Sequence, residues 1–283
     1  MPKTNKLQAW SKTADYLSCG RDIDEQVETI KKYGNHGVSQ VLRAGVLAAH
    51  GIPKPKDNAE NCIIFGCYRP FTTPFLLRDY VHLLDLLNID YTYLDNEQCC
   101  GFPFAMQTSE DLVEVCKEFN QGNINLSIEK GADRLVYCCI GCVHSANNSF
   151  RDNADQHVYI VDLILDELEK LKIKIPATKI GYFEGCHTFF KSQYQGVELD
   201  WGRYRSSLGQ IEGVEIIDLP SKMCCKVAPE KIIEKAEKMG IEKILCPCNF
   251  CYSSLKNVAD GKVQLISIPE FLIESLETNL LSE

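Results

Sequence analysis

The sequence has no long hydrophobic run, no export signal and no excess of basic residues. No stretch approaches the roughly 20 apolar residues that a membrane span requires, and the polar opening from Met1 to Trp10 lacks the apolar core of a signal peptide. There are 30 Lys and Arg residues against 39 Asp and Glu, so the net charge of -9 repels nucleic acid and anionic membranes at long range. We therefore expect a cytoplasmic protein that neither spans a membrane nor binds nucleic acid.

Two common cofactor motifs are also missing. The sequence contains neither the Gly-x-Gly-x-x-Gly pattern of dinucleotide-binding folds nor the Gly-x-x-x-x-Gly-Lys-Ser/Thr loop that binds nucleoside triphosphates. A redox function would therefore depend on electrons that are exchanged with another subunit.

Cysteine, in contrast, is abundant, with 15 among 283 residues. Disulfides rarely persist in the reducing cytosol, so many thiols in a chain that is not exported favour metal or redox chemistry. A cysteine can also pack as a small hydrophobic residue, and this interpretation suits the isolated Cys19 and Cys116. It does not explain the tight groups of cysteines elsewhere in the chain.

The chain contains an internal duplication, in which three landmarks recur in the same order. A short apolar run ends in Gly-Cys, a second run leads into Cys-Cys, and a third leads into Cys-x-x-Cys. The matching segments are 61–67 with 179–186, 89–101 with 214–226, and 130–142 with 239–251. Each half then closes with a further strand and helix, so we interpret the halves as two copies of one unit.

Helical stretches separate the strand-like runs. Apolar residues at spacings of three and four predict helices over 73–87, 109–129 and 229–239. The alternation of strands and helices predicts an α/β fold of two pseudo-symmetric, Rossmann-like βαβ halves with parallel sheets. Sites in such sheets form at the carboxyl ends of the strands, and each cysteine landmark follows a predicted strand.

Residues 1–60 belong to neither copy. We predict an N-terminal helical extension with helices over 22–32 and 38–50 and a final linker, which packs on the first half or on a partner. Its His36 and His50 are expected to be ordinary surface or core residues rather than ligands. The predicted domains are residues 1–60, 61–177 and 178–283.

Each half offers five cysteines that can meet at one site. They are Cys67, Cys99, Cys100, Cys139 and Cys142 in the first half, and Cys186, Cys224, Cys225, Cys248 and Cys251 in the second, with Cys62, Cys138 and Cys246 nearby. Two adjacent cysteines cannot readily bind the same metal ion, because the backbone directs their side chains apart. A multi-iron cluster offers irons at different positions, so the Cys-Cys pairs favour a cluster over zinc. Five thiolates also exceed the four of a structural zinc site or a cubane cluster. Zinc held by four of the five stays an alternative, and a catalytic cysteine activated by His144 or His187 is a less favoured one.

The first five cysteines carry a family resemblance. A cysteine, a Cys-Cys-Gly and a Cys-x-x-Cys, separated here by 31 and 37 residues, resemble the pattern of the cysteine-rich CCG-domain family, whose best-known member is the B subunit of heterodisulfide reductase. The matching residues are Cys67, Cys99-Cys100-Gly101 and Cys139-Ile-Gly-Cys142.

The resemblance implies a cofactor, a substrate class and partners. It implies that the five cysteines hold a non-cubane four-iron, four-sulfur cluster on which a disulfide is cleaved or formed. The implied substrate is a small thiol or disulfide or a protein-bound sulfur, and the implied partners are ferredoxin-like and flavin-containing redox subunits. Related subunits only relay electrons in succinate, lactate or glycolate-type dehydrogenase complexes, and this is the alternative function.

The second copy departs from the family pattern. Lys226 stands where the first copy has Gly101, and only 22 residues separate the Cys-Cys pair from the Cys-x-x-Cys pair, against 38 in the first copy. We expect the missing residues to be a loop on the substrate side, and the glycine to serve a turn with positive φ or a close approach. All five cysteines are present, so a second iron–sulfur cluster is expected there, of a type that the resemblance does not fix.

Overall fold

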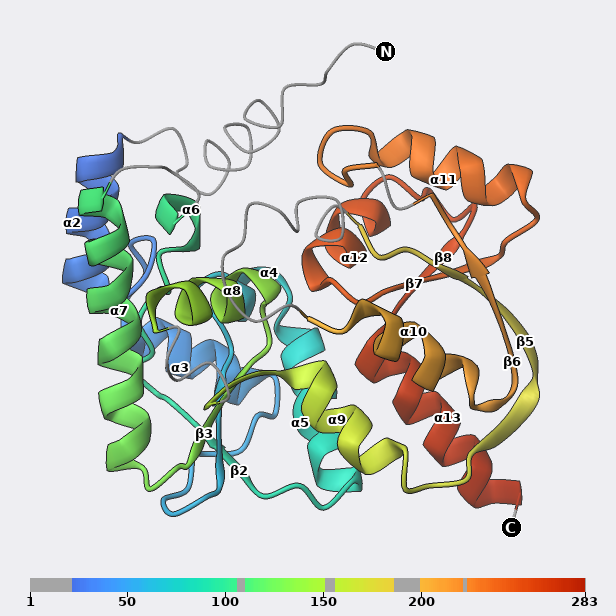
Figure 1. Cartoon of the computed structure of the whole chain (residues 1–283), viewed down its shortest axis with the longest axis horizontal. Coiled ribbons are helices and arrows are strands. Elements are labelled where there is room, and N and C mark those ends of the chain that lie inside the picture. Colours follow the sequence, from blue (N-terminus) through green and yellow to red (C-terminus); the bar gives the residue numbers. More distant parts are fainter. Residues whose placement is uncertain (1–21, 106–109, 151–155, 186–198, 221–222, 283) are drawn as a thin grey trace. The chain divides into compact units, whose positions relative to one another are not determined.

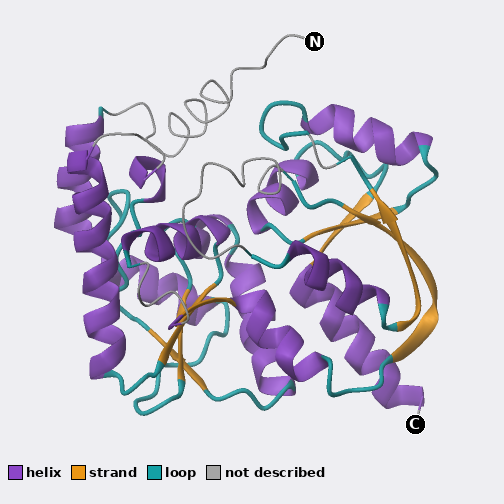
Figure 2. Cartoon of the chain, in the orientation of Figure 1, coloured by secondary structure: helices purple, strands orange, loops and turns teal. Residues whose placement is uncertain are grey.

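The computed structural model describes residues 22–105, 110–150, 156–185, 199–220 and 223–282 (Figure 1). The chain forms two compact units, of which the first contains the N-terminal helices and one parallel sheet, and the second contains another parallel sheet. Helices separate the strands along both units (Figure 2). The predicted α/β class, with two similar halves and an N-terminal helical extension, is confirmed.

The first sheet has four parallel strands in the order β2-β1-β3-β4. The strands are β1 (Asn61–Ile64), β2 (Tyr91–Tyr93), β3 (Arg134–Tyr137) and β4 (His157–Tyr159). All four residues of β1 are buried, which is typical of parallel strands whose two faces are both covered. Because β2 and β3 flank β1 on opposite sides, the strand order reverses at β1, and open α/β sheets form their sites at such a point.

The helices of the first unit are α2 (Ile23–Tyr33), α3 (Gln40–Ala49), α4 (Arg69–Thr72), α5 (Pro74–Leu86), α6 (Phe102–Ala105), α7 (Glu110–Glu129) and α8 (Ile140–Ser149). Four of them, α2, α3, α5 and α7, lie close to the predicted ranges 22–32, 38–50, 73–87 and 109–129. The first two begin at capping side chains, since Asp22 accepts a hydrogen bond from the Glu25 amide at 2.7 Å and Ser39 accepts one from the Leu42 amide at 3.2 Å.

The N-terminal extension packs on the first unit, which is one of the two arrangements expected from the sequence. Val27 and Ile30 of α2 belong to an apolar cluster with Cys99, Phe104 and Phe119. Figure 1 shows α2 beside α7, the helix that carries Phe119. The extension is therefore part of the core that lies next to the Cys-Cys pair.

The second sheet repeats the strand order of the first, as β6-β5-β7-β8, again with all strands parallel. The strands are β5 (Lys174–Tyr182), β6 (Glu212–Asp218), β7 (Lys243–Cys246) and β8 (Gln264–Ser267). The predicted domain boundary between residues 177 and 178 falls inside β5, whereas the two compact units divide near Ile160. The predicted domain ranges follow the sequence repeat, and they stay a prediction.

The helices of the second unit are α9 (Ile160–Leu168), α10 (Trp201–Gly209), α11 (Pro229–Lys238), α12 (Asn249–Lys256) and α13 (Ile268–Ser282). Among them, α11 agrees with the helix predicted over 229–239, and α9 and α13 are the helices expected to close each half. In the described part of the chain, no helix combines the length and the apolar character needed to cross a membrane.

Candidate metal centre

The carboxyl ends of three strands bring the first-half cysteines to one edge of the sheet. Cys67 follows β1, Cys99 and Cys100 follow β2, and Cys139 and Cys142 follow β3. This edge includes the point between β1 and β3 at which the strand order reverses. The backbone therefore brings all five predicted residues to one place.

The five thiols form a single group of contacting side chains. The thiols influence one another in a continuous order, Cys67 with Cys99, Cys99 with Cys100, Cys100 with Cys142, and Cys142 with Cys139. The group spans residues 67 to 142, and Cys100 and Cys142 lie 42 positions apart, so the group results from the fold and not from local sequence alone. The fold thus gathers five sulfurs in one part of the first half.

Both Cys-x-x-Cys pairs lie at the start of a helix. Cys139 is the N-cap of α8 and Cys248 is the N-cap of α12, and in each case the second cysteine lies within the first turn. Amide groups at a helix N-terminus carry partial positive charge, which favours a thiolate over a thiol. Neither capping cysteine side chain accepts a hydrogen bond from a helix amide, so the favourable effect is that of the helix N-terminus as a whole.

Glycines allow the strand ends to approach the cysteines closely. Gly66 has a φ of +92°, and a Cβ at this position would lie 3.7 Å from the Cys142 sulfur. Its counterpart Gly185 has a φ of +77°, and a Cβ there would lie 2.7 Å from the Cys251 sulfur. Because only glycine adopts such a φ without strain, the Gly-Cys landmark has the same physical cause in both halves.

The crowding of the first-half thiols separates their pKa values. Hydrogen bonds from Cys100, Cys67 and His36 hold the pKa of Cys99 well below its ordinary value despite burial. Hydrogen bonding to Cys99 and burial raise the pKa of Cys67, and hydrogen bonding to Cys100 and Cys139 together with burial raises that of Cys142. Buried thiols this close cannot all ionise unless cations neutralise their charge, so the donor set fits a group that contains several metal ions.

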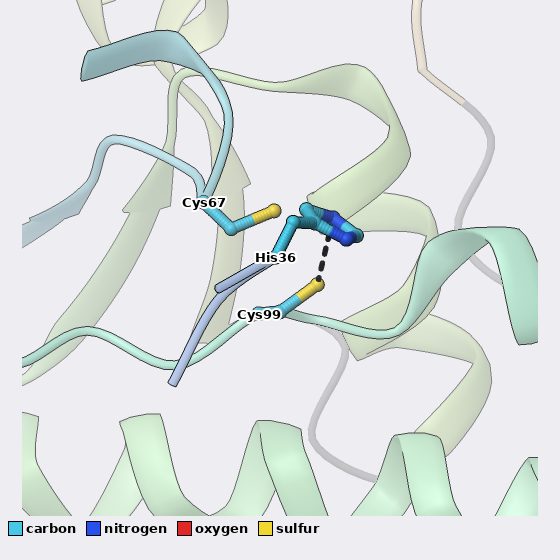
Figure 3. A group of neighbouring side chains, drawn as sticks. All are labelled: His36, Cys67 and Cys99. Atoms are coloured by element: carbon cyan, nitrogen blue, oxygen red, sulfur yellow. Dashed lines mark hydrogen bonds between the residues drawn. The ribbon is translucent and has the colours of Figure 1, made fainter. Parts of the chain in front are cut away.

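The prediction that His36 is an ordinary surface or core residue does not agree with its position. The His36 Nε2 atom lies 3.9 Å from the Cys99 sulfur, and the Nε2 atom and the sulfurs of Cys67 and Cys99 all lie within 4.8 Å of one another. Figure 3 shows the three side chains pointing toward one another. No sequence motif signals this contact, because 63 residues separate His36 from Cys99.

A buried ion pair supports the first site, and the sequence analysis missed it as well. Arg43 of α3 and Glu97 are each 1% exposed and are joined at 2.9 Å. Glu97 accepts hydrogen bonds from the amides of Phe65 at 2.9 Å and Gly66 at 2.6 Å, next to Cys67. Burial raises the pKa of Glu97 to about 7, although Arg43 and the two amides lower it. The ion pair thus holds both the segment that leads to Cys67 and the segment that leads to Cys99.

The second site repeats the thiol contacts of the first. Hydrogen bonds join Cys224 to Cys225, Cys225 to Cys251, and Cys251 to Cys248. This order corresponds, residue for residue, to the contacts that run from Cys99 to Cys139. Cys186, the fifth predicted ligand, lies outside the described residues.

Serines at equivalent positions stabilise both Cys-Cys pairs. Ser145 lies three residues after Cys142 and donates to the carbonyl of Cys100 at 2.5 Å. Ser254 lies three residues after Cys251 and donates to the carbonyl of Cys225 at 2.8 Å. The sequence analysis did not identify either serine, although comparing the two repeats at these positions would have shown the match.

The glycine of the Cys-Cys-Gly motif has the role expected for it. Gly101 has a φ of +68°, and a Cβ there would lie 2.8 Å from the Cys116 sulfur. In the second half the chain turns differently after the pair, since the amides of Val227 and Ala228 both donate to the Cys224 carbonyl. Lys226 is not among the residues with positive φ in the described chain, so it fits this other turn.

The extra residues of the first half are mainly helical, which corrects the prediction of a missing loop. Between the Cys-Cys and Cys-x-x-Cys pairs, the first half contains α6 and the 20-residue α7, whereas the second half contains the 10-residue α11. Asn120 of α7 donates to the carbonyl of Cys100 at 3.1 Å. The longer first-half connection therefore supports the site from its buried side.

The remaining cysteines are placed as core residues. Cys62, Cys138 and Cys246 are fully buried, and burial raises the pKa of Cys62 to about 12 and those of the other two well above the ordinary value. Cys116 donates to the Gly101 carbonyl at 3.2 Å from within the apolar cluster under α2. His144 is a buried residue of α8. Cys19 and His187 lie outside the described residues.

Comparison with known proteins assigns the first site to a family. Residues 63–145, which span the first five cysteines, match the model of CCG, a cysteine-rich domain. This segment of the chain is similar to the CCG cysteine-rich domain. The resemblance seen in the sequence is therefore confirmed for this part of the chain.

The relatives found are archaeal proteins of greater length. An uncharacterized iron–sulfur protein of Methanocaldococcus jannaschii is 23% identical over 70% of this chain and 38% of its own length. The D subunit of dihydromethanophenazine:CoB–CoM heterodisulfide reductase from Methanosarcina barkeri is 22% identical over 78% of this chain and 59% of its own length. The chain thus spans 38% to 59% of these relatives. The expected relation to heterodisulfide reductase is confirmed through its D subunit, and the specific likeness to the B subunit is not.

Among solved structures, glutamate racemase from Aquifex pyrophilus is similar over 77% of this chain and 82% of its own, at 16% identity and a TM-score of 0.35. This likeness bears on neither the cysteine sites nor the function.

Proposed function

We propose that this protein is an iron–sulfur subunit of a heterodisulfide-reductase-like complex and that it cleaves or forms a disulfide at its first cysteine site. The observation that carries the proposal is the single group of contacting thiols described above for Cys67, Cys99, Cys100, Cys139 and Cys142. The relation to the D subunit of heterodisulfide reductase and to an iron–sulfur protein supports it.

The donor set favours a cluster over a single metal ion. A structural zinc ion takes four ligands, so it would leave one of the five contacting thiols beside the metal without a role. Thiolates are the donors that iron–sulfur clusters take. We propose a non-cubane four-iron, four-sulfur cluster held by the five first-half cysteines, and a second cluster held by Cys186, Cys224, Cys225, Cys248 and Cys251.

The exposure of the cysteines gives the first site a protein side and a substrate side. Cys99, Cys100 and Cys142 are buried, whereas Cys67 and Cys139 are partly exposed. A four-iron cluster bound here would supply an iron that can take a substrate sulfur and a store for one electron at a time. The buried cysteines hold such a group and exclude water from it, and the partly exposed pair borders the side that a disulfide can reach.

The reaction requires partners. Reducing one disulfide to two thiols takes two electrons and two protons, and the chain has no flavin or nucleotide motif to supply the electrons. We propose ferredoxin-like and flavin-containing subunits as electron carriers, and a small disulfide or a protein-bound sulfur as substrate. The cytoplasm is the expected compartment, because a reducing environment keeps the many thiols available for metal.

Metal and sulfide analysis of the anaerobically purified protein tests the proposal. We expect about eight irons per chain, with matching acid-labile sulfide, and an EPR spectrum that changes when a thiol or disulfide is added. Irons whose spectrum does not respond to thiols would contradict disulfide chemistry and assign the chain to electron relay in a dehydrogenase complex. Zinc without iron would contradict both functions and leave a structural role.

A further inference from the structure

His36 reaches the first cysteine site from outside the cysteine-rich domain. The matched domain spans residues 63–145, whereas His36 lies in the loop between α2 and α3 of the N-terminal extension. Its Nε2 atom and the sulfurs of Cys67 and Cys99 form a group whose members are all within 4.8 Å of one another (Figure 3). The imidazole thus adds a nitrogen donor to a site made otherwise of sulfurs.

The loop that carries His36 is held in one conformation by its own residues. The Asn35 side chain accepts hydrogen bonds from the amides of Gly37 at 3.1 Å and Val38 at 2.7 Å, and donates to the Val38 carbonyl at 2.8 Å. Gly34 and Gly37 have φ values of +73° and +105°. Asn35 is 1% exposed, so the turn is built around a buried side chain and presents His36 from a fixed backbone.

The same loop is fastened to the segment that ends in the Cys-Cys pair. The Cys99 amide donates to the Gly34 carbonyl at 2.7 Å, and the Gln40 side chain donates to the Glu97 carbonyl at 3.1 Å. Arg43 adds its buried ion pair with Glu97. These three contacts fix the distance between His36 and Cys99 independently of the contact between their side chains.

We propose that His36 is a ligand of the first cluster and binds, through Nε2, the iron that Cys99 also binds. The inference rests on the proposed function, since it requires a cluster in this site. Metal–sulfur bonds of about 2.3 Å and metal–nitrogen bonds of about 2.0 Å place two ligands of one tetrahedral metal about 3.5 to 4 Å apart. The observed separation of 3.9 Å between Nε2 and the Cys99 sulfur fits this arrangement.

A histidine ligand has a consequence for the redox behaviour of the first site. A neutral imidazole leaves more positive charge on a cluster than a thiolate does, and histidine ligation is known to raise cluster reduction potentials. In the described part of the second unit no histidine lies near the cysteines. A thiolate in place of the His36 imidazole should therefore lower the reduction potential of the first cluster.

Pulsed EPR on the reconstituted full chain tests this ligand, with His36→Ala, His36→Cys and His82→Ala as variants. His82 is an exposed histidine of α5 and serves as the matched control. We expect nitrogen coupling of a directly bound imidazole in the wild type and in His82→Ala, and its loss in both His36 variants. His36→Cys restores a thiolate at the same position, so it should retain iron but have a lower reduction potential than the wild type.

The outcomes separate this inference from the function on which it rests. A wild type that contains iron but shows no imidazole coupling would overturn the ligand assignment and leave the cluster proposal intact. The same holds for coupling that persists in His36→Ala, because it would come from another histidine. A wild type without iron would overturn both.

Discussion

The two cysteine sites share their innermost contacts and differ in what surrounds them. In both sites, the Cys-Cys pair contacts the second cysteine of the Cys-x-x-Cys motif. A helix begins at the first cysteine of that motif, and a serine donates a hydrogen bond to a carbonyl of the Cys-Cys pair. Only the first site, in the described chain, also receives a histidine and a buried ion pair from an N-terminal extension. The comparison teaches that the βαβ unit itself assembles the thiols, whereas added segments specialise one copy.

This difference favours a division of labour. The first site has a nitrogen donor and a second side chain on the Cys100 carbonyl. The second has a simpler turn after its Cys-Cys pair and a shorter connecting helix. Matched variants in the two halves can test whether the first site carries the proposed substrate chemistry while the second relays electrons.

The largest effect is expected from removing one central thiol in each half. Cys100→Ser and Cys225→Ser should each lose about half of the bound iron, because each thiol contacts two others in its site. Only Cys100→Ser should also lose the EPR response to thiols and disulfides. Iron analysis and EPR of the two variants check both points.

The control for this pair is Cys116→Ser, which removes a buried thiol that contacts a carbonyl instead of another sulfur. It should retain iron at both sites. If Cys225→Ser abolished the substrate response while Cys100→Ser retained it, the roles of the two sites would have to be exchanged.

The second effect concerns the buried ion pair that only the first site has in the described chain. Arg43→Met leaves Glu97 buried without its charge partner, which should lower the unfolding free energy of the apo protein by about 3 to 5 kcal/mol. Arg203→Met, which removes a partly exposed arginine paired with Asp166 and Glu169, should cost about 0 to 1 kcal/mol. Urea denaturation followed by circular dichroism measures both.

A double variant separates lost charge pairing from lost packing. Arg43→Met with Glu97→Leu removes both charges, so part of the stability should return. The return should be incomplete, because Glu97 also accepts hydrogen bonds from the Phe65 and Gly66 amides. Equal losses for Arg43→Met and Arg203→Met would show that the ion pair does not stabilise the first unit specifically.

Much of the fold and of the thiol set could be predicted from the sequence, because both follow from local signals. Apolar periodicity gave the strands and helices, and each cysteine motif directly follows a strand, so parallel pairing had to bring the motifs to one edge. The repeat added an independent check. For this reason the helix predicted over 109–129 agrees with α7 (Glu110–Glu129), and Cys67 lies near Cys99 as expected.

The residues that the sequence analysis missed depend on contacts without a local signal. Arg43 and Glu97 are separated by 54 positions, and each is of a type that is usually exposed. His36 lies in a segment outside the repeat, so no second copy pointed to it. The helix over 109–129 and the difference in connection length were both predicted, but the sequence did not show that this helix accounts for most of the difference.

The third effect tests the Cys-Cys-Gly motif against its second-half counterpart. Gly101→Ala places a Cβ 2.8 Å from the Cys116 sulfur at a φ of +68°, which should cost about 2 kcal/mol and weaken iron retention at the first site. Lys226→Gly should change stability by about 1 kcal/mol or less, because the turn there does not need a glycine.

Thermal and urea unfolding, with iron content, measure the two variants. Adding Cys116→Ala to Gly101→Ala relieves the close contact but not the backbone strain, so recovery should be partial. Full recovery of stability would show that Gly101 is needed only because a Cβ would collide with the Cys116 sulfur, and not because of its positive φ.

The smallest effect is expected at the two equivalent serines, and the second half should be the more sensitive. Ser145→Ala leaves the Cys100 carbonyl with its hydrogen bond from Asn120, so the loss should be about 0.5 kcal/mol. Ser254→Ala removes the side-chain donor to the Cys225 carbonyl, and the loss should approach about 1.5 kcal/mol. Urea unfolding of both variants decides the order. A larger loss for Ser145→Ala would mean that Asn120 does not compensate, and the longer α7 would then have no stabilising role at the first site.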